Sequence, residues 1–368
     1  MKHTFDKRDA IVLLIIFCAY LGVAGYRISY PSTLMFDEVA FIPQAQQLAH
    51  GGEILESTHP PLGKFVAAAS IYLLGDNPFS WRLPSLVAGA GILCLVYSLG
   101  YALSGTRLPG AFAAFLLSFE SLAFVQSRTA LYSSPMLFFM LLAILLMVRW
   151  REHRGRAALL GAALSFGAGV ATRWVALSAI VVIGYLWWGG VFRSRQGLRR
   201  SVSDAILFLS VSSALYLGLF VVGPISRGEG ILSAISLNVH MFSDHWTNLL
   251  TPHRYASPWW TWPLLRRPVW WGFESYPMLA LDGSQVVEGI ISIGNPVVFA
   301  AIPIAVVWGF VKAYREQSLY ASVMLLGLFS QWLQWSWVPQ NTYMHYFYTV
   351  LPHGHVGVEG ICDAAHLA

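Results

Sequence analysis

The sequence predicts an all-α protein that crosses a membrane about nine or ten times and forms a single domain over residues 1–368. Hydrophobic residues make up 56% of the chain and charged residues only 11%, where soluble domains carry about 25%. The mean hydropathy is +0.58. The net charge of +5 would suit a nucleic-acid partner, but the basic residues fall in short clusters between apolar runs, as membrane topology requires. We therefore exclude nucleic-acid binding.

Long apolar runs define the transmembrane segments, because a spanning helix needs roughly 20 apolar residues. The first run is long and has no convincing cleavage site after it, so we interpret it as an uncleaved anchor rather than a signal peptide. A tenth span begins near Tyr343, and the chain then ends in a polar tail that cannot cross a bilayer. The tail is either peripheral or the end of a truncated chain, and we favour truncation. The nine clear candidates are about 10–26, 83–104, 108–127, 131–149, 157–172, 174–192, 204–225, 291–311 and 318–337.

The basic clusters predict the orientation. They lie before the first span and at 149–156, 193–200 and 312–315. A cytoplasmic N-terminus places all of them inside, as the positive-inside rule demands. A first loop, 27–82, and a large loop, 226–290, then face outward. A short apolar helix over Lys64–Gly75 is expected to lie at the membrane surface.

Two adjacent acids, Asp37 and Glu38, are the candidate catalytic residues in the first loop. The simpler interpretation is a solvated acid pair, or a cap for a helix over Val39–Gln47. A carboxylate at this position could instead take the proton from an attacking hydroxyl. Because adjacent side chains point in different directions, we expect Asp37 to be the base and Glu38 to bind or position.

Cations for a lipid-linked phosphate follow along the chain. In His59-Pro-Pro-Leu-Gly-Lys64 the prolines stiffen the backbone at His59, and Lys64 is either a snorkelling lysine or a phosphate ligand. Arg82, Arg128 and Arg173 each sit at the outer end of a span, against the topological charge bias. They are ordinary interfacial anchors or parts of a phosphate clamp, since guanidinium matches phosphate geometry.

Other polar and aromatic residues are expected to support the site. Glu120 lies inside a span, where a carboxylate is costly, and we expect it to pair with an outer arginine. Trp259, Trp260 and Trp262 belong to a tryptophan-rich stretch that is either an aromatic belt or a substrate lid. Three histidines of the large loop, at 240, 245 and 253, lack a metal-binding frame, and we predict no metal site.

Together these motifs resemble the protein O-mannosyltransferase family of polyprenyl-phosphate-sugar-dependent, C-type glycosyltransferases. The matching pieces occur in the family's order from about residue 34 to 352 and are FDEVAF, HPPLGK, NPFSWRLPS, FVQSRTALYSSPMLFF, GVATRWVAL, SPWWTWPLLRRPVWW, GNPVVF and MHYFYTVLP. The resemblance implies that Asp37 and Glu38 match the essential acidic motif, and that Lys64, Arg82 and Arg128 match basic residues of the family's outer face.

The resemblance also implies an activity and a place for it. The family transfers mannose from a polyprenyl-phosphate carrier to Ser or Thr hydroxyls of exported proteins and inverts the anomeric centre. The large loop is too short for the MIR domain of eukaryotic members, so the chain looks like a bacterial or archaeal member in the cytoplasmic membrane. The chain departs from the family at Ser57, with Glu56 one step earlier, and around Tyr132–Ser134, where the family usually has acids.

The chemistry of the donor explains the residue types. The leaving group is already a phosphate, so it needs cations and no general acid, and a single displacement needs one carboxylate base. No metal is required, although a divalent ion that bridges acid and phosphate stays an alternative. Rival interpretations are a related transferase that moves another sugar to a lipid or polysaccharide, a transporter or flippase, and a non-catalytic scaffold.

Overall fold

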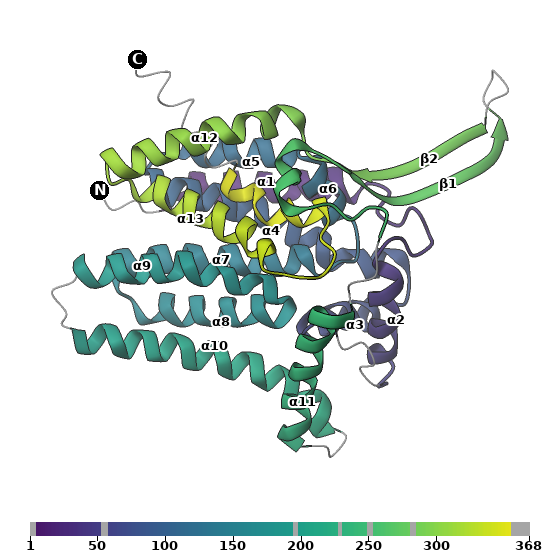
Figure 1. The fold of residues 1–368 in the computed structure, drawn as a ribbon, viewed down its shortest axis with the longest axis horizontal. Helices are drawn as coiled ribbons and strands as arrows, with labels where there is room; N and C mark the ends of the chain where they lie inside the picture. The colour runs from purple at the N-terminus through teal and green to yellow at the C-terminus, as the bar shows by residue number, and fades with distance from the viewer. Residues whose placement is uncertain are drawn as a thin grey trace.

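The computed structural model describes residues 5–52, 58–193, 198–226, 230–248, 253–279 and 285–354. Figure 1 shows a bundle of long helices with a β-hairpin and several short helices gathered at one end. The long helices of the bundle, in chain order, are α1 (Lys7–Gly25), α4 (Pro78–Ser104), α5 (Arg107–Ser118), α6 (Ser121–Ser127), α7 (Ser133–His153), α8 (Arg156–Thr172), η1 (Trp174–Ala179) with α9 (Ile180–Arg193), α10 (Leu198–Ser226), α12 (Pro296–Arg315) and α13 (Leu319–Leu333).

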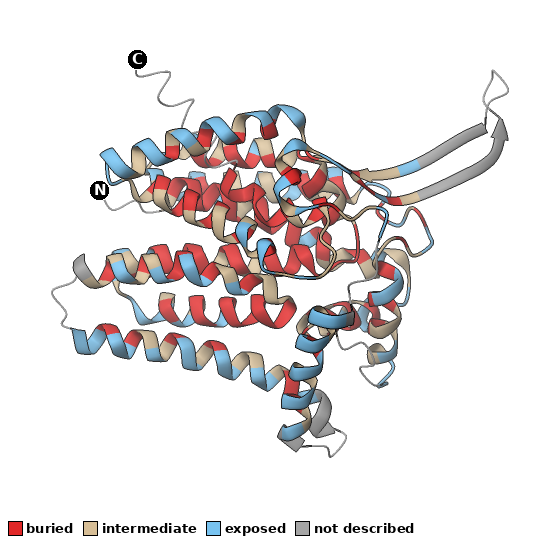
Figure 2. Ribbon diagram, viewed as in Figure 1, coloured by how far each residue is buried: buried red, intermediate tan, exposed pale blue. Residues whose placement is uncertain are grey.

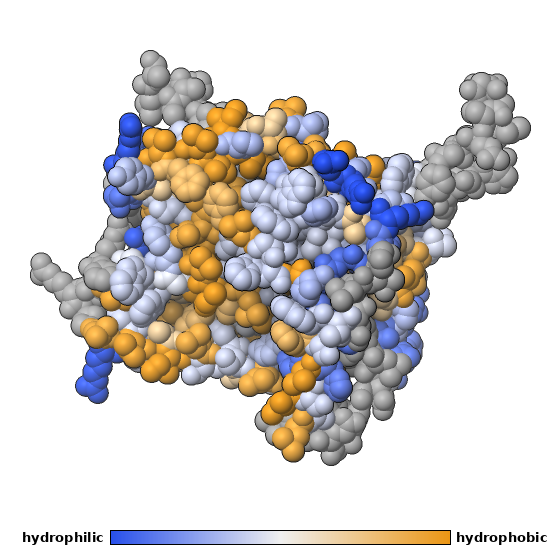
Figure 3. All heavy atoms as spheres, viewed as in Figure 1, coloured by the Kyte–Doolittle hydropathy of each residue, from blue (hydrophilic) through white to orange (hydrophobic). Residues whose placement is uncertain are grey.

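Each of the nine predicted spans contains a helix or two consecutive helices, although the span predicted over 291–311 begins before its helix, α12. By length and composition, six helices in the described chain can cross a membrane, and a bent pair, α5 with α6, makes a seventh. The two helices of that pair meet at 73°. α8 and α13 are shorter, with 17 and 15 residues. Figure 3 shows apolar residues spread over the helical part of one face and the most hydrophilic residues toward its two ends.

Helix α4 is the central element, because 78% of its most apolar window is buried, against 17% for α1. The Asn77 side chain caps its start by accepting from the amides of Phe79 and Ser80, and Gly105 ends it with φ 84°. Gly110 of α5 lies so close to the Tyr97 carbonyl of α4 that a Cβ would overlap it. Figure 2 shows the buried residues concentrated on α4, α7 and α8, with α10 and α12 more exposed.

The remaining elements gather at the end of the bundle opposite the N-terminus (Figure 1). The first loop supplies α2 (Glu38–Ala49) and α3 (Leu62–Leu74), which confirm the helices predicted over 39–47 and 64–75. The other elements are α11 (Gly230–Ser243), η2 (Asp244–Asn248), η3 (Trp259–Leu264), β1 (Val269–Leu279), β2 (Gln285–Ser292), η4 (Gln334–Ser336) and η5 (Met344–Thr349).

A β-hairpin is added to the predicted helical fold. Strand β1 pairs antiparallel with β2 in a register that joins Val269 to Ser292, with an irregularity between Trp270 and Gly272. Both strands are rich in aromatic and β-branched residues, which favour a pleated conformation. The predicted tenth span begins as η5, and its continuation beyond residue 354 lies outside the described residues.

Candidate active site

The two adjacent acids of the first loop have opposite environments. The Glu38 carboxylate is fully buried and accepts four hydrogen bonds. Its Oε1 accepts from Arg82 Nε at 2.9 Å and from the Ala130 amide at 2.8 Å. Its Oε2 accepts from Arg82 Nη2 at 2.9 Å and from the Met35 amide at 3.1 Å. With every lone pair facing a donor, Glu38 anchors the loop and does not reach a substrate in this arrangement.

Arg82 is the other half of this buried ion pair. Besides the two bonds to Glu38, it donates to the carbonyls of Ile28 at 2.9 Å, Pro31 at 2.8 Å and Thr33 at 3.1 Å. These bonds use all five guanidinium hydrogens, and the side chain is fully buried. The structure therefore argues against the predicted contact between Arg82 and the donor phosphate. Arg82 instead fixes the turn that leads to the acids.

Asp37 has the properties of a reactive carboxylate. It stands at the N-cap of α2, but its side chain makes no capping bond, and no hydrogen bond or ion pair holds it within the described chain. Burial raises its pKa above the ordinary value, while the positive charges of Arg173 and His253 oppose that rise. A carboxylate that is partly desolvated and has no partner is a stronger proton acceptor than a solvated one.

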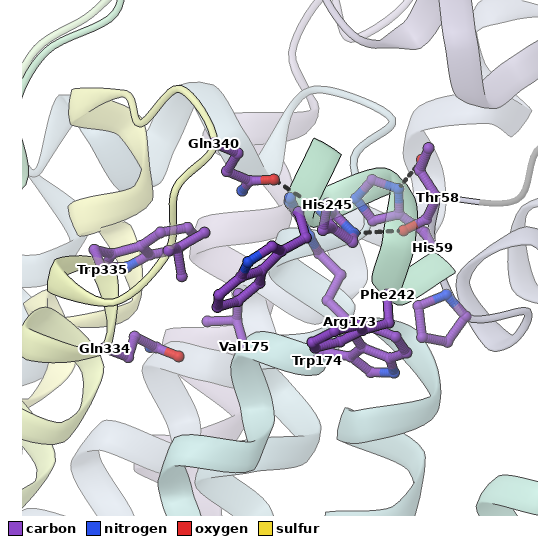
Figure 4. A pocket seen from close by; sticks show the side chains of 13 residues that line it. Thr58, His59, Arg173, Trp174, Val175, Phe242, His245, Gln334, Trp335 and Gln340 are labelled. Carbon is purple, nitrogen blue, oxygen red and sulfur yellow. Dashed lines mark hydrogen bonds between the residues drawn. The ribbon is translucent and has the colours of Figure 1, made fainter. Parts of the chain in front are cut away.

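A pocket of about 190 Å³ opens at the junction of the first loop, α11 and the α13 end. In Figure 4, Thr58 and His59 stand on one side of it and Gln334 and Trp335 on the other. Its wall is mostly aromatic, with polar groups at a few points. The lining side chains include Thr58, His59, Arg173, Trp174, Phe242, His245, Trp246, Gln334, Trp335 and Gln340.

Arg173 is the predicted phosphate ligand that lines this pocket. It directly precedes η1, where α8 ends and the backbone is extended at φ −153°. Its Nη1 donates to Ser133 Oγ at 2.7 Å, and its guanidinium lies 5.9 Å from the Tyr346 ring centre. Its charge also acts on Asp37. Arg173 is therefore the cation that the fold places between the pocket and the free carboxylate.

The predicted His59–Lys64 motif holds one edge of the pocket. Lys64 is 1% exposed, and its Nζ donates to the His59 carbonyl at 2.8 Å, so it closes the turn around the two prolines. The His59 ring lines the pocket and stands edge-on to Phe41, with ring centres 5.1 Å apart. Residues 53–57, which include Glu56 and Ser57, lie outside the described residues.

Arg128 lies away from this pocket. It donates to the carbonyls of Ala24, Tyr26 at 2.8 Å and Arg27 at 3.3 Å, and so satisfies the end of α1. It lines a second pocket that shares no residue with the first. The structure does not bring Arg128 together with Arg173 as one phosphate clamp.

Glu120 is fully buried at the break between α5 and α6. The prediction that it pairs with an arginine is wrong. Its Oε1 accepts from the backbone amide of Asn295 at 2.8 Å and weakly from that of Leu122 at 3.4 Å. The carboxylate thus joins the bend to the start of α12. Its role is structural, as expected, but through the backbone rather than through an ion pair.

The three tryptophans of η3 do not line the pocket. Trp260 is 55% exposed, whereas Trp262 is fully buried and stands 5.9 Å from the Trp335 ring. Trp335 in turn stacks on Tyr346 at 4.3 Å. Trp259 meets Trp332 edge-on at 5.7 Å. Trp262 therefore packs against Trp335, an aromatic residue of the pocket wall, and Trp259 packs against Trp332.

His245 connects three segments at this end of the bundle, a function that the sequence did not indicate. Its two ring nitrogens lie 2.7 Å from Gln340 Oε1 and 2.7 Å from the Thr58 carbonyl (Figure 4). The structure brings no group of three histidine, cysteine, aspartate or glutamate side chains together as a metal site in the part of the chain that it describes. Sequence reasoning also missed Trp174 and Gln334; the first directly follows Arg173 in the quoted GVATRWVAL piece.

Comparisons with known proteins agree with this architecture. The family model for dolichyl-phosphate-mannose-protein mannosyltransferases matches residues 58–222. A polyprenol-phosphate-mannose–protein mannosyltransferase of Mycolicibacterium smegmatis is 25% identical, over 87% of this chain and 74% of the relative. One from Corynebacterium glutamicum is 21% identical, over 86% and 74%.

Solved structures share the fold at low sequence identity. The Saccharomyces cerevisiae Pmt1–Pmt2 complex bound to the sugar donor matches 98% of this chain and 86% of its own, with a TM-score of 0.83 and 12% identity. ArnT from Cupriavidus metallidurans matches 96% and 60%, with a TM-score of 0.66 and 15% identity. These matches confirm the predicted resemblance and the C-type glycosyltransferase fold. The chain is an integral membrane protein.

Proposed function

We propose that this protein transfers mannose from a polyprenyl-phosphate carrier to Ser or Thr hydroxyls of exported proteins, at the outer face of a prokaryotic cytoplasmic membrane. The matched relatives carry the names of polyprenol-phosphate-mannose–protein mannosyltransferases. The observation that carries the proposal is the partnerless Asp37 carboxylate under the charge of Arg173, a residue that itself lines an aromatic pocket. A base and a phosphate-binding cation are the two groups that this reaction needs.

The reaction is a single displacement. The acceptor hydroxyl oxygen attacks the anomeric carbon of the sugar, and its proton passes to the Asp37 carboxylate. The bond between the anomeric carbon and the phosphate oxygen breaks, and that oxygen keeps the electron pair. Arg173 stabilises the charge on the leaving phosphate by hydrogen bonds that strengthen as the charge grows. Attack opposite to the leaving group inverts the anomeric centre.

Glu38 acts one step away from the chemistry. Its buried pair with Arg82 fixes the backbone that presents Asp37, because Glu38 is the next residue in the chain. The prolyl turn at His59 and the Trp335 wall border the pocket in which the sugar would sit, since aromatic faces pack well against pyranose rings. Lys64 stabilises this turn by its hydrogen bond to the His59 carbonyl. No metal enters these steps.

The orientation follows from the basic clusters. The junction of α7 with α8, the end of α9, the start of α10 and the junction of α12 with α13 lie at the N-terminal end of the bundle in Figure 1, whereas α2, α3, α11 and the hairpin lie at the other. The positive-inside rule assigns the basic end to the cytoplasm. The pocket then opens where exported proteins and the sugar of a flipped lipid carrier meet.

The experiment is a product assay with defined donors and acceptors. Purified protein in lipid vesicles is given polyprenyl phosphates that carry mannose, glucose or aminoarabinose, with either a Ser/Thr-rich peptide or a lipid as acceptor. We expect mannose on the peptide, in the linkage inverted from the donor. Transfer of another sugar, or transfer only to the lipid, would favour the related C-type activity. A protein that binds the donor but transfers to no acceptor would contradict an enzymatic role.

A further inference from the structure

The second pocket is a distinct feature of the same end of the bundle. It has a volume of about 530 Å³ and lies between the end of α1, α6 and β2. Most of its wall is apolar, from residues such as Val23, Phe124 and Ile290. Arg27 and Arg128 supply its charge. The pocket is therefore amphiphilic, with two cations at one side of an apolar hollow.

These two arginines have no acidic partner in the described part of the chain. Arg128 gives its hydrogen bonds to the three backbone carbonyls of residues 24, 26 and 27. Arg27 is exposed, and its guanidinium lies 4.6 Å from the Tyr30 ring centre. Two adjacent unneutralised cations favour an anion, and the bond from Arg128 to the Arg27 carbonyl keeps the two residues together.

The surroundings of the pocket indicate a lipid rather than a free anion. Helix α1 is largely unburied, and Val23 and Tyr26 at its end are 67% and 72% exposed. The end of a spanning helix lies at the level of the lipid headgroups, where tyrosine is enriched and where arginine meets phosphate. An anion with attached acyl chains would satisfy both the cations and the apolar wall.

We propose that this pocket binds an anionic phospholipid of the surrounding leaflet, with the headgroup phosphate on Arg27 and Arg128 and an acyl chain against Val23, Phe124 and Ile290. The site is separate from the candidate active site. It does touch the same loop, because Tyr30 and Met35 line it, and the carbonyls of the neighbouring residues 28, 31 and 33 hold Arg82. A bound lipid would therefore brace the turn that leads to the two acids, and it would raise the thermal stability of the protein.

The test measures binding of short-chain lipids to the full protein in detergent. Dioctanoyl phosphatidylglycerol is expected to bind saturably and to raise the unfolding midpoint, and dioctanoyl phosphatidylcholine to bind more weakly. Arg27→Gln should weaken phosphatidylglycerol binding about fivefold, as about 1 kcal/mol for one interfacial arginine implies. Arg27→Lys should keep most of the affinity. Arg266→Gln is the matched control, an exposed arginine at the same end outside the pocket.

Several results would overturn the proposal. Equal affinity of wild type and Arg27→Gln would show that the lipid binds elsewhere. Equal binding of the two lipids would show that the charge of the headgroup does not determine binding. Displacement of the lipid by inorganic phosphate at the same concentration would make the pocket a free-anion site. A change of oligomeric state in Arg27→Gln, with lipid binding intact, would identify the surface as a contact between copies.

Discussion

Adjacent acids with opposite environments should respond in opposite ways to the same amide substitution. In Glu38→Gln, one carboxylate oxygen becomes an NH₂ group. In either orientation that group faces two donors, Arg82 and the amide of Ala130 or Met35. Two hydrogen bonds to a charged group are lost, each worth about 1.5–3 kcal/mol. The sum is similar to the free-energy cost of breaking a buried ion pair, which is about 3–5 kcal/mol.

Asp37→Asn should leave stability intact. No hydrogen bond is lost, because the Asp37 carboxylate has no partner in the described chain. The folded-state pKa is raised by burial, so the ionised form opposes folding at any pH above that raised pKa. Its contribution to stability is favourable only at lower pH. At pH 7 the Asn variant should therefore be as stable as wild type or slightly more stable.

The assay is thermal unfolding of both variants in the same detergent, monitored by tryptophan fluorescence. At about 1.3 °C per kcal/mol for a chain of 368 residues, Glu38→Gln should lower the midpoint by about 4 °C or more. Asp37→Asn should stay within about 1 °C. Equal midpoints for the two variants, or a larger loss in Asp37→Asn, would refute the assignment of Glu38 as the anchor and Asp37 as the free carboxylate.

Three further predictions concern the pocket. Arg173→Gln should raise the KM for the lipid donor about tenfold or more, as loss of a charge-assisted bond implies, and Arg254→Gln, at the same end, should not. The base must be ionised, so the transfer rate should rise with pH, with a midpoint above 3.8, the ordinary pKa of an aspartate side chain. Transfer rates of the purified protein across a pH series check this. His245→Ala removes the bonds to Thr58 and Gln340, so amide hydrogen exchange in the backbone after Thr58 should become faster, and unchanged protection would contradict the tether.

Much of the fold could be predicted, because an apolar run long enough to cross a bilayer does so as an α-helix. The hairpin could not, since its aromatic-rich strands also suit an interfacial loop. The short α11 was not predicted, because its 14 residues are too few to span a membrane and lie in a segment interpreted as a loop. The hairpin packs against α6, and α11 packs against α10. A single sequence does not show such contacts.

The site was predicted in its residue types more than in its geometry. The structure leaves the Asp37 carboxylate without a partner in the described chain and places Arg173 in the pocket wall, and their roles as base and cation stay predictions. Arg82 has the residue type of a phosphate ligand, but three carbonyls from residues 28–33 and Glu38 consume its donors. Glu120 bonds to a backbone amide 175 residues away, and a backbone group leaves no mark in a sequence.

Donor binding and transfer measured side by side for Asp37→Asn test the central claim most directly. Substitution of a positioned base costs about 10²–10⁴-fold in rate. We expect the variant to bind polyprenyl-phosphate mannose as wild type does, while transfer to a Ser/Thr peptide falls at least 100-fold, the lower end of that range. An Asp76→Asn control, at an exposed acid of the same end that bonds Gln46 and Trp81, should transfer normally. Transfer by Asp37→Asn near the wild-type rate would contradict the account.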